Sequence, residues 1–204
     1  MLEAASFPDK STLRRALRAA RASVPADHRR LAGERLVRWA LRHRLLARKR
    51  RIGFYMPSKN EIDLEPLLNR ARAMGVDCYL PQVPGRRRRK LWFIRLGDED
   101  AWRLNRYGIP EYHHASARRI RAYQLDLLFL PLLGFDRRGW RIGMGGGYYD
   151  ASLAKLPGRR HWKSPALIGV AFQAQEVDRI PRDGWDVPLR AILTEQGYLT
   201  AQRR

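Results

Sequence analysis

Residues 125–133 constrain the fold most, because they are almost wholly apolar, with only Asp126 and Pro131 interrupting the run. A strand buried on both faces gives such a continuous run, whereas a half-exposed strand alternates apolar and polar residues. Similar strand patterns alternate with helical patterns along the chain. Strands are expected at residues 51–56, 76–80, 91–96, 166–172 and 191–195, and helices at residues 64–74 and 148–156. The alternation predicts an α/β fold: a three-layer, Rossmann-like arrangement with a mostly parallel sheet and helices on both faces.

The N-terminal part has the apolar spacing of two consecutive helices. Leu13 and Leu17 share one side of the first helix, which Asp9 or Ser11 can cap, and Val24-Pro25 separates it from a second helix at residues 26–43. No linker or internal repeat follows. We therefore expect an N-terminal helical pair within a single domain spanning residues 1–204.

The chain has one cysteine, Cys78, and no apolar stretch of signal-peptide or membrane-spanning length. These features favour a cytoplasmic protein without a membrane partner. The formal net charge of +21 permits a polyanionic partner such as nucleic acid. However, only residues 86–90 form a dense basic block, and we interpret the charge mainly as a solvated surface.

The run from Arg141 to Asp150 carries the strongest chemical signal, since it places four glycines within five positions before a predicted helix. Glycine lets backbone amides approach phosphate oxygens closely. Arg141 adds a forked cationic donor, and Asp150 can reach a magnesium ion. The alternative is a glycine-rich hairpin without catalytic meaning. The run from Arg141 to Asp150 is not a Walker loop, because no Gly-Lys-Ser/Thr follows its glycines.

The whole stretch of residues 130–150 resembles the signature of the 5-formyltetrahydrofolate cyclo-ligase family. Further segments resemble the family in the same order. These are residues 10–14, 54–57, 61–63, 107–111, 168–172, 180–181, 185–186 and 193–195, with Gln175. The resemblance covers almost the whole chain and implies ATP-dependent closure of 5-formyltetrahydrofolate to 5,10-methenyltetrahydrofolate. ADP and phosphate are released, and ATP and Mg²⁺ are required.

The resemblance also implies roles for individual residues. The expected ATP-binding residues are Lys10, Ser11, Thr12, Leu13, Arg14, Arg141, Ile142, Gly143, Met144, Gly145, Gly146, Gly147, Tyr148 and Tyr149. The expected folate-binding residues are Met56, Glu61, Tyr107, Met144, Gly145, Gly146, Gly147 and Tyr148. Arg141 and Tyr148 are the expected catalytic residues, and Asp150 and Asp186 the expected magnesium ligands.

Simpler interpretations exist for several of these positions. Lys10 can belong to a solvated helix start, Glu61 can serve the N-terminus of the next helix, and Asp186 can be a turn residue before Pro188. The chain also departs from the family pattern at Ala151, where arginine is common, at Tyr112, where proline is common, and at Trp185, where histidine is common.

The expected partner is 5-formyltetrahydrofolate, with or without a polyglutamate tail, bound by a monomer or homodimer. We expect no nucleic-acid partner despite the net charge. There are two alternative functions. The chain could be a basic nucleic-acid-binding protein that reuses an enzyme fold, or a different nucleotide-dependent enzyme.

Overall fold

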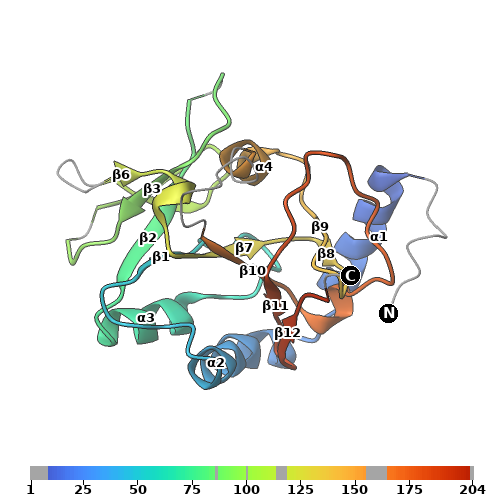
Figure 1. Ribbon diagram of the computed structural model, residues 1–204, viewed down its shortest axis with the longest axis horizontal. Coiled ribbons are helices and arrows are strands. Elements are labelled where there is room, and N and C mark those ends of the chain that lie inside the picture. The colour runs from blue at the N-terminus through green and yellow to red at the C-terminus, as the bar shows by residue number, and fades with distance from the viewer. Residues whose placement is uncertain (1–8, 86, 100, 114–118, 155–164, 203–204) are drawn as a thin grey trace.

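The computed structural model describes residues 9–85, 87–99, 101–113, 119–154 and 165–202. Its centre is an eight-stranded sheet (Figure 1). From one edge to the other the strands are β12 (Tyr198–Thr200), β11 (Ala191–Leu193), β10 (Ala166–Val170), β7 (Leu127–Pro131), β1 (Arg51–Gly53), β2 (Asp77–Gln82), β3 (Trp92–Arg95) and β6 (Arg119–Ile120). The five strands from β11 to β2 are parallel, and the outer pairs are antiparallel. The predicted mostly parallel sheet is confirmed.

Strand β7 is buried on both faces, as its apolar run predicts. Alternate side chains enter opposite cores: Leu127 and Phe129 pack in the cluster beneath the sheet, and Leu128 and Leu130 in the cluster above it. This alternation follows from the two-residue period of a strand. β7 ends at Pro131, earlier than the predicted end at residue 133, because the chain then turns into a hairpin.

The order of the parallel strands contains a topological switch point between β1 and β7. After β1 the chain adds β2 on one side, and it then returns to place β7 on the other side. In open α/β sheets, ligands bind beyond the carboxyl ends of the strands at such a point. The segments after β1 and after β7 therefore border the expected ligand site.

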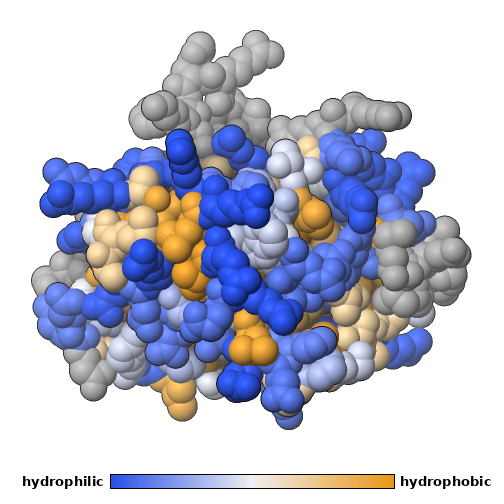
Figure 2. Space-filling model, turned by 90° about the horizontal axis from the view of Figure 1, so that it is seen from below, coloured by the Kyte–Doolittle hydropathy of each residue, from blue (hydrophilic) through white to orange (hydrophobic). Residues whose placement is uncertain are grey.

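Helices cover both faces of the sheet, which confirms the three-layer prediction. Helices α2 (Ala26–Arg42) and α3 (Glu65–Ala73) pack together on the lower face in Figure 1. The upper face carries the short helices α4 (Tyr148–Leu153) and η2 (Ala122–Gln124), while residues 155–156 of the predicted fourth helix lie outside the described part. Seen from below in Figure 2, the surface is mostly hydrophilic with small separate hydrophobic patches, as expected of a solvated outer layer.

Both predicted N-terminal helices are present, but they rest on different parts of the fold. Helix α1 (Lys10–Ala22) lies at the side of the sheet in Figure 1, where Leu13 and Leu17 pack with Leu133 and Ile142. Helix α2 instead joins the core under the sheet. None of the described helices has the length and apolar character to cross a membrane.

Two hairpins and the edge strands β6 and β12 lie outside the sequence prediction. β4 (Trp102–Leu104) pairs with β5 (Pro110–Tyr112), and β8 (Gly134–Phe135) pairs with β9 (Arg141–Ile142). The buried carboxylate of Asp136 organises the second hairpin. It accepts hydrogen bonds from the amides of Arg138 and Trp140 and forms an ion pair of 2.8 Å with the Arg138 guanidinium. This hairpin places the glycine-rich run directly after β9.

Candidate active site

The glycine-rich loop, residues 143–147, connects β9 to α4. Gly145 and Gly147 have φ values of +99° and +68°, a backbone conformation that residues with a side chain rarely adopt. A Cβ atom at Gly143 or Gly145 would meet no atom within 4 Å among the described residues, so the loop surface is open there. The glycines therefore allow the backbone to turn as it does and leave the backbone open to close approach by a ligand.

Helix α1 holds this loop through a row of arginines. Arg14 Nε donates to the Gly143 carbonyl at 3.0 Å, and Arg18 Nη2 donates to the Met144 carbonyl at 3.3 Å. In a planar trans peptide the carbonyl and the following amide point in opposite directions. The amides of Met144 and Gly145 are consequently turned away from α1, where they can face a ligand.

Arg141 follows the β8–β9 turn with a side chain that is only 7% exposed. Nη1 donates to the Val187 carbonyl at 2.6 Å, and Nη2 forms an ion pair of 2.7 Å with Asp150 Oδ1. Burial lowers the pKa of Arg141, while the negative charges of Asp150 and Asp186 act in the opposite direction. Arginine retains its charge at neutral pH, so Arg141 provides a fixed positive charge beside the Asp150 carboxylate.

Asp186 and Lys10 both contact Asp183. The Asp183 amide donates to Asp186 Oδ2 at 2.7 Å, so Asp186 does close a turn, as its simpler interpretation held. Lys10 Nζ lies 2.7 Å from Asp183 Oδ2. Lys10 is thus tied to the Asp183–Asp186 turn and is not a merely solvated helix start.

Asp150 and Asp186 are the two carboxylates expected to hold magnesium. Among the described residues no group of three or more His, Cys, Asp or Glu side chains could hold a metal. Asp150 and Asp186 nevertheless both lie close enough to influence Arg141. Magnesium usually takes one or two protein carboxylates and completes its shell with water and substrate phosphates. A pair of carboxylates is the donor set that such an ion needs.

Glu61 is buried beside the glycine loop, with a side chain that is 8% exposed. The Ser58 amide donates to Glu61 Oε2 at 2.7 Å, and Arg21 Nη1 lies 3.4 Å from Oε1. The amide of Glu65 in the first turn of α3 is instead bound by Asp63, at 2.8 Å. The alternative role of Glu61 at the start of that helix is therefore wrong.

Tyr107 and Tyr148 meet across the top of the site. Their hydroxyl oxygens lie 2.7 Å apart, and Arg106 donates to the Tyr148 hydroxyl. Hydrogen bonding with Tyr148 and Arg106 lowers the pKa of Tyr107, and the hydrogen bond with Tyr107 raises the pKa of Tyr148. The turn of the β4–β5 hairpin thereby contacts the start of α4.

Several other predicted site residues make contacts within the fold. Leu13 and Ile142 are buried in the core between α1 and the β8–β9 hairpin, and the amides of Ser11 and Thr12 donate to the Asp9 carboxylate. Met56 lines a cavity of about 470 Å³ with Trp102, Pro110 and other residues. Tyr149, a residue of α4, packs against the upper core. Burial and the negative charge of Glu61 raise the pKa of its hydroxyl.

Three arginines of the site were absent from the sequence prediction: Arg18, Arg21 and Arg106. Arg14, Arg18 and Arg21 stand at positions i, i+4 and i+7 of α1, so they share one helix face. That spacing is visible in the sequence and could have identified two of them. Arg106 depends on the β4–β5 hairpin, which the sequence pattern did not predict.

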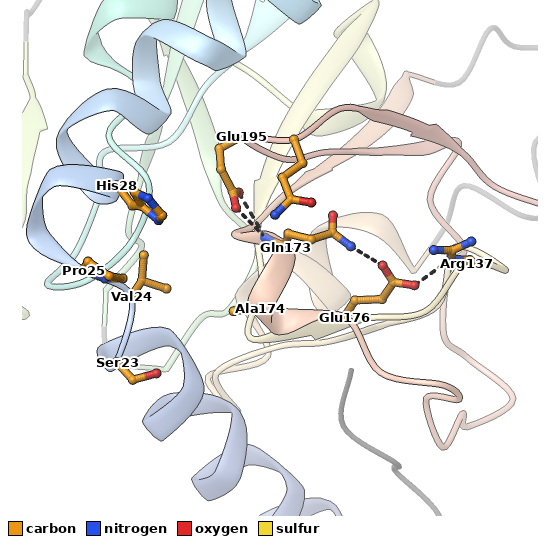
Figure 3. A pocket seen from close by; sticks show the side chains of 10 residues that line it. Ser23, Val24, Pro25, His28, Arg137, Gln173, Ala174, Glu176 and Glu195 are labelled. Atoms are coloured by element: carbon orange, nitrogen blue, oxygen red, sulfur yellow. Dashed lines mark hydrogen bonds and ion pairs between the residues drawn. The ribbon is translucent and has the colours of Figure 1, made fainter.

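A separate pocket of about 520 Å³ lies between the α1–α2 junction and the short helix η3 (Gln173–Gln175) (Figure 3). No predicted site residue lines it. Its carboxylates are engaged: Glu176 forms an ion pair of 2.7 Å with Arg137, and Glu195 accepts from the Gln173 amide at 3.0 Å. The glycine loop therefore remains the candidate site.

The geometry defines the class of the protein: an α/β enzyme with an open glycine-rich loop that follows the β8–β9 hairpin, beyond the carboxyl end of the central strand β7. The model of the 5-formyltetrahydrofolate cyclo-ligase family matches residues 6–195. The chain belongs to this family of ligases.

Individual relatives agree with that assignment. The 5-formyltetrahydrofolate cyclo-ligase of Haemophilus influenzae is 30% identical over 186 residues, which are 90% of this chain and 96% of the relative. The enzyme of Escherichia coli K12 is 31% identical over 143 residues, 70% of this chain and 76% of that one. The solved structure of Aquifex aeolicus 5,10-methenyltetrahydrofolate synthetase has a TM-score of 0.77 at 27% identity, covering 96% of this chain and 94% of its own.

Proposed function

We propose that this enzyme catalyses the ATP-dependent cyclisation of 5-formyltetrahydrofolate to 5,10-methenyltetrahydrofolate, with release of ADP and phosphate. Family membership supports the reaction, and one observation of the site carries it. A buried guanidinium, Arg141, is ion-paired with Asp150 at the base of an open glycine loop and is influenced by the charge of Asp186. Such a site suits the transfer of a phosphoryl group, because fixed charges stabilise the charge that develops on it.

The chemistry requires activation of the formyl oxygen, which is a poor leaving group. Transfer of the terminal phosphoryl group of ATP to this oxygen creates a good leaving group. N10 of the folate then attacks the activated carbon, the bond from this carbon to the phosphate oxygen breaks, and the N10 proton is released. The protein needs no nucleophile of its own for these steps, since it has to position the two substrates and exclude water.

The ATP side of the site is proposed to comprise the start of α1 and the glycine loop. Lys10 and Arg14 bring cations, Arg141 brings the buried guanidinium, and the outward amides of Met144 and Gly145 supply hydrogen-bond donors. Asp150 and Asp186 would hold Mg²⁺ together with the phosphates. A bound Mg²⁺ would neutralise charge on the phosphate chain.

The folate side is proposed to lie across the loop from the phosphates. The carboxylate of Glu61 can accept a pair of N–H donors from the pterin ring. Met144 and Tyr148 of the loop, with Tyr107 above them, would pack against the folate. Arg106 and Arg21 border these residues in the structure, with contacts to Tyr148 and Met144.

A basic pocket next to this site suits a polyglutamate tail. It has a volume of about 630 Å³ and is lined by Gln82, Val83, Pro84, Gly85, Arg88, Arg89, Lys90, Trp92 and Arg121. Arg89 also approaches Gly147, since its Nη1 lies 3.2 Å from where a Cβ atom of that residue would stand. Carboxylates that extend from a bound folate would meet these cations. Arg86, the first residue of the basic block, lies outside the described residues.

The location and assembly of the enzyme are also proposals. The single cysteine, Cys78, is buried, and burial raises the pKa of its thiol to about 12. An unreactive thiol and the lack of any possible intrachain disulfide fit a cytoplasmic enzyme. We propose that the enzyme works as a monomer or homodimer.

An absorbance assay for methenyltetrahydrofolate tests the proposal. The purified enzyme is mixed with 5-formyltetrahydrofolate, ATP and Mg²⁺, and ADP is measured in parallel. We expect product to form with ADP in a one-to-one ratio, and only when ATP is present. A rate equal to that of the reaction without enzyme would reject the function.

A further inference from the structure

Arg21, in the last turn of α1, connects two parts of the site. Its Nη1 lies 3.4 Å from Glu61 Oε1, and its Nη2 lies 4.0 Å from the Met144 sulfur. The side chains of Arg21 and Glu61 are each 8% exposed, so the pair is almost completely removed from water. One guanidinium thus contacts both the carboxylate that follows β1 and the glycine loop.

Stability alone accounts poorly for this pair. Removing two charges from water is costly, and a buried ion pair often stabilises a protein no better than apolar residues of similar size. The geometry of this pair is loose, and Arg21 Nε has no hydrogen-bond partner among the residues that the structure describes. If packing were the only role of this side chain, an apolar residue would fill the space without the free-energy cost of removing a charge from water.

The contacts of Glu61 indicate what Arg21 does. The Ser58 amide binds one carboxylate oxygen and Arg21 contacts the other, so each oxygen of the carboxylate has a partner from a different part of the chain. Each carboxylate oxygen can accept two hydrogen bonds, so each retains capacity for a ligand donor. A carboxylate held in this way is prepared for two parallel N–H groups on one edge of a flat ring.

We propose that Arg21 is a positioning residue for substrate specificity, which orients Glu61 to bind the N–H edge of the substrate ring and aligns it with the glycine loop through Met144. The ligand class is a ring that carries an amide N–H beside an amino group, as the pterin of folate does. This inference rests on the proposed function, in which Glu61 binds the folate. ATP binding, on the far side of the loop, does not depend on the Arg21–Glu61 contact.

Direct binding measurements test this role. Dissociation constants for 5-formyltetrahydrofolate and for ATP are determined by equilibrium dialysis for the wild type, Arg21→Met, Glu61→Gln and the double variant. We expect Arg21→Met to weaken folate binding at least tenfold and to leave ATP binding within twofold. The double variant should bind folate no more weakly than Glu61→Gln alone, because Arg21 acts through Glu61. Arg15→Met, an exposed change on the same helix, should leave both constants within twofold.

Other outcomes would overturn the inference. Folate binding by Arg21→Met within twofold of the wild type would do so, as would losses that multiply in the double variant. If Arg21→Met fails to fold, Arg21→Lys replaces it: lysine keeps the charge but is shorter and lacks the fork, so folate binding should weaken at least threefold, and unchanged binding would reject the role. Folate binding that responds as expected in a protein without ring-closing activity would reject the proposed function alone.

Discussion

Arg141 and Asp150 form an ion pair of 2.7 Å in which the arginine side chain is 7% exposed and the aspartate side chain is 53% exposed. The arginine end is fixed by burial and by its bond to the Val187 carbonyl. The aspartate end uses one oxygen for Arg141, and about half of its side chain remains exposed. The pair therefore anchors an accessible carboxylate at the start of α4, where a metal ion held by phosphates can reach it.

Removal of this carboxylate should impair turnover. We expect Asp150→Ala to lower kcat at least tenfold, equivalent to about 1.4 kcal/mol of transition-state stabilisation, and to raise the Mg²⁺ concentration needed for half-maximal rate. Initial rates across a Mg²⁺ titration provide the measurement. Asp27→Ala is the matched control, because Asp27 is also an exposed acid in the first turn of a helix. Equal rates for the two variants would remove Asp150 from the site.

The fork of Arg141 should matter as much as its charge. In Arg141→Lys a single ammonium group replaces two donors that now bind Val187 and Asp150 separately. We expect kcat/KM to fall about a hundredfold, which corresponds to about 2.7 kcal/mol. Arg38→Lys, an exposed change on α2, supplies the comparison. A loss of less than threefold would show that charge alone is sufficient at this position.

The conformation of the loop predicts unequal costs for alanine at two of its glycines. Gly147 has a φ of +68°, whereas Gly143 is not among the residues with positive φ. We expect Gly147→Ala to lower the free energy of unfolding by about 1 kcal/mol more than Gly143→Ala, because a Cβ atom is strained in the left-handed region. Urea titrations of both variants measure the difference. Equal unfolding free energies would mean that the loop conformation is not held in solution.

The start of α1 predicts a stability change at acid pH. Hydrogen bonding by the Ser11 side chain, followed by the amides of Thr12 and Ser11, lowers the pKa of Asp9 from 3.8 to about 2. A carboxylate with a lowered pKa stabilises the fold above its ordinary pKa, and this contribution is lost as the pH falls through the lowered value. The Tm difference between the wild type and Asp9→Ala should thus be full above about pH 5 and should shrink from pH 4 to pH 2.

Asp9→Asn provides the control for that titration. Asparagine caps a helix but does not ionise, so the Tm difference between Asp9→Asn and Asp9→Ala should not vary with pH. A wild-type difference that is equally constant from pH 5 to pH 2 would contradict the role of the Asp9 charge.

The sequence predicted most of the sheet because each central strand has a strong local pattern. The run in residues 125–133 produced β7, and the expected strands and helices all recur with ends shifted by a few residues. The β4–β5 and β8–β9 hairpins escaped prediction because their pairing depends on contacts distant in sequence. The buried Asp136 carboxylate is one example, as it also binds the amide of Ile180, 44 positions further along the chain.

The candidate site was predicted residue by residue, yet the contacts between its parts were not. Resemblance placed Lys10, Glu61 and Asp186 in the site, but their partners Asp183 and Arg21 were unnamed. The local sequence around a lysine or an arginine is the same whether or not a carboxylate from a distant segment lies beside it. Only the fold places α1 against the glycine loop, and so converts its arginine spacing into a set of contacts.

The basic pocket predicts dependence on the length of the glutamate tail. Arg88 and Lys90 line the pocket and are exposed, so their charges can attract carboxylates beyond the first glutamate. We expect the double variant Arg88→Gln/Lys90→Gln to raise KM for 5-formyltetrahydrofolate pentaglutamate about tenfold and to leave KM for the monoglutamate within twofold. Raised salt should reduce the difference between wild type and variant, since exposed charges are screened. The same two changes at Arg30 and Arg38 on α2 remove equal charge from the opposite side of the sheet and should alter neither KM. An equal effect of both double variants would assign the tail preference to net charge, and an unchanged pentaglutamate KM would exclude the pocket from substrate binding.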